Sequence, residues 1–233
     1  MFCHKCGTQV GLGVRFCPNC GESLTAASSA SGGAAPPVWT PPAGVQARAG
    51  HWVDEGWQMV KADIGTFMLL TIVFAILNSA VPMILHGPLI AGFHIFCIKK
   101  LLHRRTDFAD LFKGFDFFVP TLVASLVIGL LVGCGTLLCI IPGLVLAAMF
   151  EFTYLFIVDK RMDFWPAMQA SHAVVKSDYF GFTMFLLLMG LVVILGALCC
   201  IVGLLVAFPV TIAAVTVAYK EIVGFEPRTL ETF

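Results

Sequence analysis

The chain has 233 residues, of which 59% are hydrophobic and only 12% are charged. Soluble domains carry roughly 25% charged residues, so this composition excludes an ordinary soluble globular protein and is typical of a polytopic membrane protein. The formal net charge is zero, which gives no sign of a polyanionic partner. We therefore expect an all-α protein that crosses a lipid bilayer, because helices satisfy their own backbone hydrogen bonds there.

Two Cys-x2-Cys pairs stand at the start of the chain, Cys3 with Cys6 and Cys17 with Cys20. Each pair can direct two thiolates at one ion, a spacing that is typical of tetrahedral Zn²⁺. Because four cysteine ligands leave no open coordination position, the predicted zinc site is structural. A redox dithiol or a set of disulfides is the alternative, which the paired spacing disfavours. Residues 1–24 are too few to bury a stabilising core and should fold only with the metal.

A linker is predicted to follow this metal module. Residues 25–49 are rich in Ala, Ser, Gly and Pro. Such a segment cannot bury enough apolar surface to order itself, so we expect it to be disordered. We assign residues 50–224 to a helical membrane domain and residues 225–233 to a short polar tail.

The membrane domain opens with an amphipathic stretch, residues 51–61, which is typical of a helix lying at the headgroup level. An apolar run from Ile64 to Leu85 then predicts a membrane span. The residues His86-Gly87-Pro88 are predicted to turn the chain into a second run, 89–102. That run is short for a span, and the sequence leaves open whether it crosses fully, begins within the turn or is re-entrant.

A second hairpin is predicted over residues 117–158, after a surface helix at 99–116. Its two apolar runs meet at Pro142-Gly143, which we expect to form a tight turn. A third polar segment, residues 159–178, precedes the last pair of apolar runs, at 179–202 and 204–219.

An internal repeat relates these hairpins. The ten residues from Leu138 to Ala147 align with those from Leu198 to Ala207, sixty positions further on. We predict about six transmembrane helices, arranged as three hairpin repeats with interfacial helices, and both termini on one face of the membrane.

The positive charges predict the orientation. All fourteen Lys and Arg residues fall outside the three predicted hairpin tips. By the positive-inside rule both termini are then cytoplasmic, in agreement with reduced cysteines that bind zinc in the cytosol. The expected location is the cytoplasmic (inner) membrane of a bacterium.

Glu151 is the single charged side chain in the two apolar runs of the second hairpin. A charged side chain at mid-membrane costs about 2.5–3.5 kcal/mol on insertion scales, so Glu151 should face the interior of the bundle. It could form an intramembrane proton or cation site, with Asn78, His86 or His94 as a partner. The alternative is a protonated Glu that is hydrogen-bonded to a neighbouring helix.

Residues 1–24 resemble the zinc ribbons at the N-terminus of many bacterial membrane and regulatory proteins. The likeness is carried by the four cysteines together with Gly7, Pro18 and Gly21. The resemblance implies a role in protein contacts or, less often, in nucleic-acid binding. Lys5 and Arg15 form no basic stripe, so a nucleic-acid partner is not expected.

Five short motifs of the membrane domain resemble another family. They are Gly87-Pro88-Leu89 with Gly92, Asp110 to Phe115, Ile140 to Gly143, Trp165-Pro166-Ala167 with Ser171, and Pro209 with Tyr219. They are similar to motifs of uncharacterised six-span bacterial membrane proteins, close to the membrane domain attached to some glycerophosphodiester phosphodiesterases. The resemblance implies a fold and a membrane location and brings no catalytic residues.

The sequence has no Gly-rich phosphate loop, no Gly-x-Ser-x-Gly and no His-Glu-x-x-His. We therefore expect no enzymatic activity. The predicted function is an integral membrane scaffold or regulatory protein that presents its zinc ribbon to a protein partner. The alternative is a transporter or channel-like protein for a small or lipidic solute, with Glu151 in the pathway.

Overall fold

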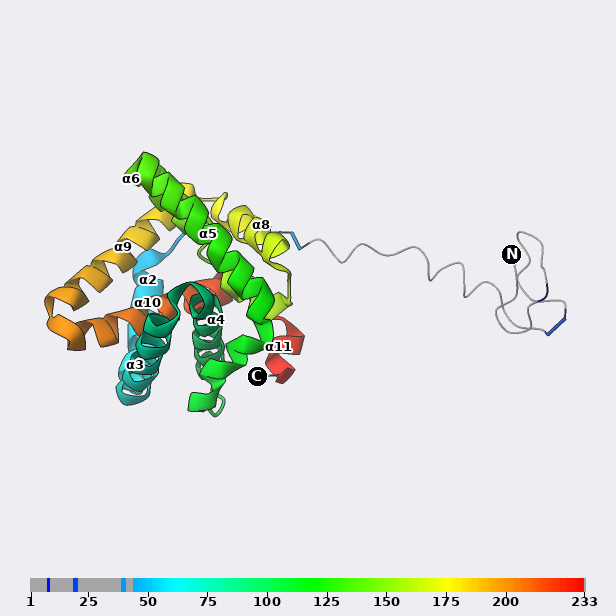
Figure 1. Ribbon diagram of the computed structural model, residues 1–233, viewed down its shortest axis with the longest axis horizontal. Helices are drawn as coiled ribbons and strands as arrows, with labels where there is room; N and C mark the ends of the chain where they lie inside the picture. Colours follow the sequence, from blue (N-terminus) through cyan, green and yellow to red (C-terminus); the bar gives the residue numbers. More distant parts are fainter. Residues whose placement is uncertain (1–7, 9–18, 21–38, 41–43, 233) are drawn as a thin grey trace. The chain divides into compact units, whose positions relative to one another are not determined.

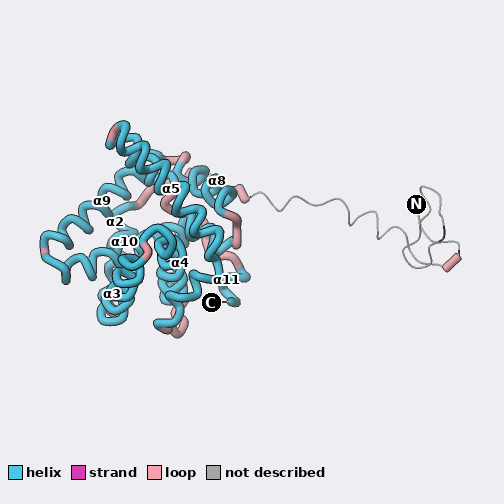
Figure 2. The backbone as a smooth tube through the Cα atoms, in the orientation of Figure 1, coloured by secondary structure: helices cyan, strands magenta, loops and turns pink. Residues whose placement is uncertain are grey.

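The computed structural model describes residues 8, 19–20, 39–40 and 44–232, and every regular element among them is a helix (Figures 1 and 2). The chain divides into two compact units, Met1–Trp39 and Thr40–Phe233. The second unit contains α2 (Ala49–Ala62), α3 (Ile64–Ala80), α4 (Pro82–Leu101), the 3-10 helix η1 (Phe108–Phe117), α5 (Phe118–Leu138), α6 (Ile140–Met149), α7 (Thr153–Lys160), α8 (Phe164–Val175), α9 (Tyr179–Leu198), α10 (Cys200–Ile222) and α11 (Pro227–Thr232). The all-α fold class is confirmed.

The predicted number of membrane spans agrees with the structure. Among the described residues, five helical stretches are long and apolar enough to cross a membrane: Pro82–Leu101, Phe108–Leu138, Ile140–Lys160, Tyr179–Leu198 and Val202–Ile222. The consecutive helices α2 and α3, bent by 98° relative to each other, make a sixth candidate when they are counted together. Because α3 is the apolar member of this pair, the near-right angle is compatible with a membrane-spanning α3 and an α2 that lies along the surface.

The first hairpin turns at Val81, and the prediction of a turn at His86-Gly87-Pro88 is wrong. Val81 has φ −144° and ψ 75°, and Pro82 is the first residue of α4. A residue before proline avoids the helical region, whereas proline itself is favoured at the first helical position. Since α4 continues through Pro88, the short second run is part of a full-length helix of 20 residues.

The second hairpin turns at Cys139 rather than at Pro142-Gly143, so that prediction is also wrong. Cys139 is extended, with φ −166° and ψ 142°, and α6 begins at the next residue. Pro142 lies in the first turn of α6, where its missing N–H costs no intrahelical hydrogen bond. The third hairpin turns at Cys199, which is the position sixty residues after Cys139.

The second and third hairpins make matching close contacts one turn beyond these two cysteines, as the predicted repeat between them requires. A Cβ atom placed on Gly143 would lie 2.7 Å from the Cα atom of Thr136 on α5. A Cβ atom on Gly203 would lie 3.0 Å from the carbonyl carbon of Gly196 on α9. Positions 136 and 196 are again sixty residues apart, so glycine permits the same close approach of the two helices in both hairpins.

The helices that precede the hairpins link one hairpin to the next. The 3-10 helix η1, which precedes the second hairpin, packs against α4 of the first. Helix α8, which precedes the third hairpin, packs against α7 of the second. Helix α2, which precedes the first hairpin, packs against α10 of the third, so the order of packing is cyclic.

Aromatic side chains fill the core between α3, α4 and α10. The ring centroids of Phe74 and Phe208 are 4.8 Å apart, and Phe67 meets Phe96 edge-on at 5.3 Å. Phe93 also contacts Phe208, at 5.8 Å. Since each aromatic side chain buries about 150–250 Å², this cluster holds the first hairpin against the last helix of the third.

Candidate functional site

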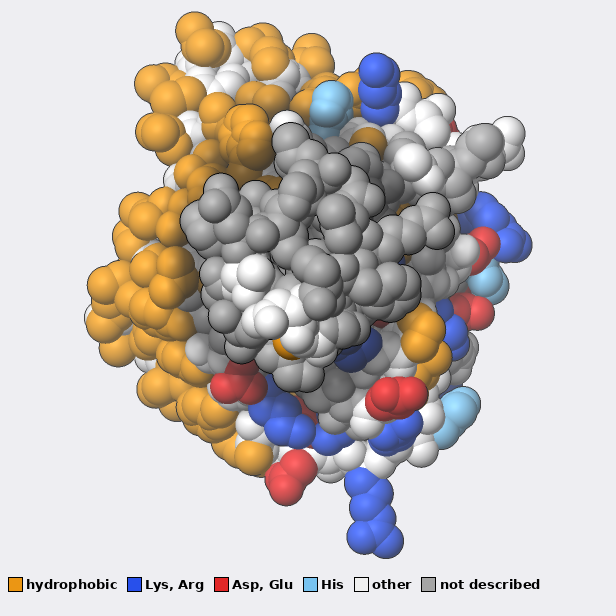
Figure 3. All heavy atoms as spheres, turned by 90° about the vertical axis from the view of Figure 1, so that its right-hand side faces the viewer, with side chains coloured by type: hydrophobic (Ala, Val, Ile, Leu, Met, Phe, Trp, Pro, Cys, Tyr) orange, Lys and Arg blue, Asp and Glu red, His pale blue; other side chains and the backbone are white. Residues whose placement is uncertain are grey.

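Charged side chains gather at the ends of the helices opposite the hairpin turns. Figure 3 shows most of them along the lower edge and the right side of one face, whereas hydrophobic side chains cover its left and upper left. The turns themselves are apolar and strongly exposed, with 86% of Leu138 and 70% of Ile141 accessible. This division is the one expected of helices whose apolar ends enter a bilayer and whose charged ends stay in water.

The first polar junction joins α4 to η1. The Lys99 ammonium donates to both carboxylate oxygens of Asp110, at 2.9 and 2.8 Å. Asp110 also accepts from the backbone N–H of Asp107 at 2.9 Å and pairs with Lys113 at 2.8 Å. Lys99 and Asp110 are both buried. A buried carboxylate with this many donors keeps its charge, whereas an isolated one would not.

A second ion pair joins α4 to the start of α3. The Lys100 ammonium donates to Asp63 at 2.7 Å, and the Thr66 hydroxyl donates to the same carboxylate at 2.7 Å. These two hydrogen bonds lower the pKa of Asp63 below its ordinary value.

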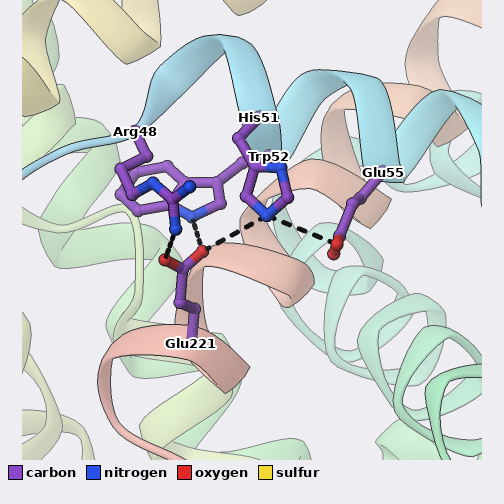
Figure 4. Close-up of polar contacts among 5 residues, drawn as sticks. All are labelled: Arg48, His51, Trp52, Glu55 and Glu221. Carbon is purple, nitrogen blue, oxygen red and sulfur yellow. Dashed lines mark hydrogen bonds and ion pairs between the residues drawn. The ribbon is translucent and has the colours of Figure 1, made fainter.

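The second polar junction joins α2 to α10 through Glu221 (Figure 4). The Glu221 carboxylate accepts from Arg48 at 2.8 Å and from the indole N–H of Trp52 at 2.5 Å. Trp52 is fully buried, and its ring meets that of Phe185 edge-on at 5.0 Å. His51 lies 3.3 Å from Glu55 and 3.9 Å from Glu221. Glu221 thus accepts a hydrogen bond from the single side-chain N–H group of Trp52, whose ring is otherwise apolar.

Asp159, at the end of α7, holds the C-terminal segment. Its carboxylate accepts from the Tyr219 hydroxyl at 2.9 Å and from the backbone N–H of Glu226 at 3.0 Å. The Thr229 hydroxyl donates to the backbone carbonyl of Asp159 at 2.9 Å. Asp159 and Thr229 are both buried. Part of the tail, residues 225–233, is therefore packed against the membrane domain.

The third polar junction lies at a break between two helices, within the apolar stretch Ile140–Lys160. Helix α6 ends at Met149 and α7 begins at Thr153. The Ser171 hydroxyl of α8 donates to the carbonyl of Met149 at 2.7 Å and accepts from the N–H of Phe152 at 3.2 Å. Because a broken helix in a membrane leaves backbone groups unpaired, Ser171 supplies partners that the break removes.

Glu151 lies within this break, near the middle of the stretch Ile140–Lys160, as predicted. Both of its carboxylate oxygens are buried and have no hydrogen-bond partner among the described residues. The hydroxyl of Thr153, two residues on, is also buried and unpaired there. The predicted burial of Glu151 is thus found, without the predicted partner.

Asn78 and the two histidines do not join Glu151. The side-chain oxygen of Asn78, on α3, is buried and likewise has no partner in the described part of the chain. His94 contacts the Thr216 hydroxyl through Nδ1 at 2.8 Å. The His86 ring lies 6.1 Å from that of Phe74. No hydrogen bond among the described residues therefore joins Glu151 to Asn78.

Of the four predicted zinc ligands, Cys3, Cys6 and Cys17 lie outside the described residues. Cys20 lies in a described turn with Asn19 and is exposed. The side-chain amide of Asn19 donates to the Thr8 hydroxyl at 3.0 Å. Thr8 follows the first Cys-x2-Cys pair closely and Asn19 lies inside the second, so this bond joins the two loops that would hold the metal. The donor set of four cysteines fits Zn²⁺.

Sequence reasoning missed the polar junctions. The pairing of Lys99 with Asp110 spans two elements and leaves no local pattern. One signal was present, because Asp107 and Asp110 form a capping box at the start of η1. In the sequence, Ser171 was noted only in a motif that resembles another family. The structure shows that its hydroxyl bonds the backbone on both sides of the α6–α7 break.

Comparison with known proteins identifies the N-terminal module. The zinc-ribbon domain family matches residues 2–24. This match covers the Cys-x2-Cys pairs and supports the assignment of a structural zinc ribbon.

Two mycobacterial proteins are similar to part of the chain. "Uncharacterized protein Mb2590" of Mycobacterium bovis is 33% identical and "Uncharacterized protein Rv2560" of Mycobacterium tuberculosis is 32% identical, each over 103 residues. The match covers 44% of this chain and 32% of each relative. The chain thus spans about a third of the length of these relatives. No solved structure matches the chain. None of these matches supports the expected likeness to the glycerophosphodiester phosphodiesterase membrane domain.

Proposed function

We propose that this protein is an integral membrane scaffold or regulator that holds a zinc ribbon at the cytosolic face of a bacterial cytoplasmic membrane. The observation that carries the proposal is the anchoring of the chain where it enters the membrane domain. The backbone N–H of Ala47 donates to the Asp178 carboxylate at 3.1 Å, and Arg48 pairs with Glu221. Both contacts lie at the charged ends of the helices, so the chain enters the membrane domain on its charged side.

Orientation follows from the same charges. The charged ends hold the described Lys and Arg residues, whereas the turns at Val81, Cys139 and Cys199 hold none. By the positive-inside rule the charged ends, and with them both termini, face the cytosol. Reduced cysteines are available there to bind a metal.

The partner of the ribbon is proposed to be a protein. A closed site of four cysteines has no position for substrate, so the metal would stabilise a small recognition surface rather than perform a reaction. We accordingly propose no enzymatic activity.

The test compares two Cys→Ser variants of the full chain in membranes of a native host. Cys17→Ser removes a zinc ligand, whereas Cys134→Ser changes an exposed cysteine near a hairpin turn and serves as the control. Site-specific cross-linking from Thr8, followed by mass spectrometry, should identify the same partner for the unmodified chain and for Cys134→Ser, and lose it for Cys17→Ser. A partner retained by Cys17→Ser would contradict the proposal.

A second candidate function is proton-coupled transport through a pathway that contains Glu151. The observation that favours it is the pair of buried, unpartnered carboxylate oxygens at the α6–α7 break. An acidic side chain at this depth is rare and often marks a proton or ion pathway. Proteoliposomes with a pH-sensitive dye should then show proton flux that Glu151→Gln abolishes. Equal flux in both preparations, or none in either, would exclude Glu151 as a carrier.

A further inference from the structure

A groove of about 420 Å³ runs between α2 and the charged ends of α4 and α10. Its polar wall includes Glu55 and Gln58 of α2, Lys100 in the last turn of α4, His103 just beyond that helix, and Lys220 of α10. Met59 and Leu101 contribute apolar surface to the same groove. A concave site with an apolar floor and a cationic rim is typical of sites that bind amphipathic anions.

The rim holds two lysines, Lys100 and Lys220, and one carboxylate, Glu55, and they differ in whether they already have a partner. Lys100 is already paired with Asp63, and the acidic residue of the wall, Glu55, lies 3.3 Å from His51. Lys220 is exposed and has no ion-pair partner within 4.0 Å in the described part of the chain. It is therefore the cation that a phosphate group could engage without breaking an existing pair.

The backbone holds His103 at this rim. His103 has φ 54°, a left-handed conformation that is uncommon outside glycine and asparagine. The hydrogen bonds from His103 N–H to the Lys100 carbonyl at 3.1 Å, and from Arg104 N–H to the Lys99 carbonyl at 3.0 Å, close the end of α4 around it. These bonds stop the helix and keep His103 beside Lys100 at the groove.

The level of the groove in the membrane indicates which kind of anion it could bind. It lies beside α2, which bends by 98° from α3 and exposes 39% of Trp57. Tryptophan is enriched at the level of lipid headgroups, and basic grooves on the cytosolic side of membrane helices bind anionic headgroups. A phospholipid would set its phosphate against the rim and its glycerol and first methylenes against the apolar floor.

We propose that this groove, lined by Gln58, Lys100, His103 and Lys220, is a binding site for an anionic phospholipid. The site rests on the membrane placement given above and not on the partner of the zinc ribbon. A lipid bound in this groove would contact both α2 and α10, whose packing closes the cyclic order of the hairpins.

The full chain, purified in detergent, is titrated with palmitoyl-oleoyl phosphatidylglycerol and with the matching phosphatidylcholine, and bound lipid is counted by native mass spectrometry. We expect phosphatidylglycerol to bind the unmodified chain at least about five-fold more tightly. Lys220→Gln should weaken phosphatidylglycerol binding by about five-fold, whereas Lys220→Arg should retain it. Lys176→Gln removes another exposed lysine, after α8, and should have no effect.

Equal binding of the two lipids by the unmodified chain would overturn the proposal. So would an equal loss in Lys220→Gln and Lys176→Gln, because binding would then follow total charge. His103→Gln, which should also weaken binding of phosphatidylglycerol, tests the site independently of Lys220. Resistance of the unmodified chain to alkaline extraction from membranes is measured separately, so that a failure of membrane placement is distinguished from a failure of the lipid site.

Discussion

Gly114 of η1 lies against Gly92 of α4 so closely that a Cβ atom at position 114 would stand 2.9 Å from the Cα atom of Gly92. A Cβ atom on Gly92 would in turn stand 2.6 Å from the carbonyl carbon of Leu111. Gly92 and Gly114 belong to two separate sequence motifs, Gly87-Pro88-Leu89 with Gly92 and Asp110 to Phe115. The structure shows that these two motifs form one contact between helices.

Gly92→Ala should therefore destabilise the membrane domain by about 1–3 kcal/mol or more, because backbone atoms cannot yield to the added methyl group. Gly129→Ala is the control, since nothing lies within 4 Å of a Cβ atom there. It should be neutral or stabilising by up to about 1 kcal/mol in α5. Thermal unfolding in detergent, followed by intrinsic fluorescence, measures both. Equal stability of the two variants would show that the contact between α4 and η1 can relax.

Lys99→Met should lower the free energy of unfolding by about 3–5 kcal/mol, because it removes the main partner of the buried Asp110 carboxylate. Lys176→Met, at an exposed position, should change it by less than about 0.5 kcal/mol. Chemical unfolding in mixed micelles provides the comparison. A double variant, Lys99→Met with Asp110→Leu, should recover much of the loss, since no unpaired charge would remain buried. Failure of that recovery would indicate that the pair itself specifies the packing of η1.

Ser171→Ala should cost about 1–3 kcal/mol, because it leaves the Met149 carbonyl and the Phe152 N–H at the α6–α7 break without their partner. Ser79→Ala, which removes a single exposed bond to the Ile76 carbonyl, should cost less than about 1 kcal/mol. Hydrogen exchange measured by mass spectrometry should show faster exchange over residues 150–153 in Ser171→Ala alone. Unchanged exchange there would mean that the break is held by packing.

Removal of zinc should leave the membrane domain intact. Chelation, or Cys17→Ser, should reduce bound Zn²⁺ from about one ion per chain to a small fraction. The unfolding temperature of the membrane domain should not change, since residues 1–39 form a separate compact unit. Zinc analysis by mass spectrometry and thermal unfolding are measured on the same samples. A lower unfolding temperature after chelation would reveal a stabilising contact between the two units.

The number of membrane helices could be predicted because hydropathy and the repeat around Cys139 and Cys199 both depend on local sequence. The positions of the turns were harder to predict. Proline at Pro88 and Pro142 was interpreted as a helix breaker, whereas both residues lie within helices. The signal for the true first turn was Val81-Pro82, where a residue that avoids the helical region precedes a favoured first helical residue.

The candidate site could be predicted only in part. The burial of Glu151 follows from its place in an apolar run, and the zinc ligands follow from spacing. The absence of a bond between Glu151 and Asn78 could not be anticipated, because it depends on how separate hairpins face each other. The same holds for Glu221, whose partners Arg48 and Trp52 are 173 and 169 residues away in sequence.

The contact between Trp52 and Glu221 has a consequence for biosynthesis. A ribosome adds about 5–20 residues per second, so roughly 10 to 30 s separate the synthesis of these two side chains. During that time the aromatic face of α2 must rest in the lipid headgroups or on the insertion machinery. The first helix of the membrane domain to be made is thus among the last to find its place, and the domain closes when the third hairpin enters the bilayer.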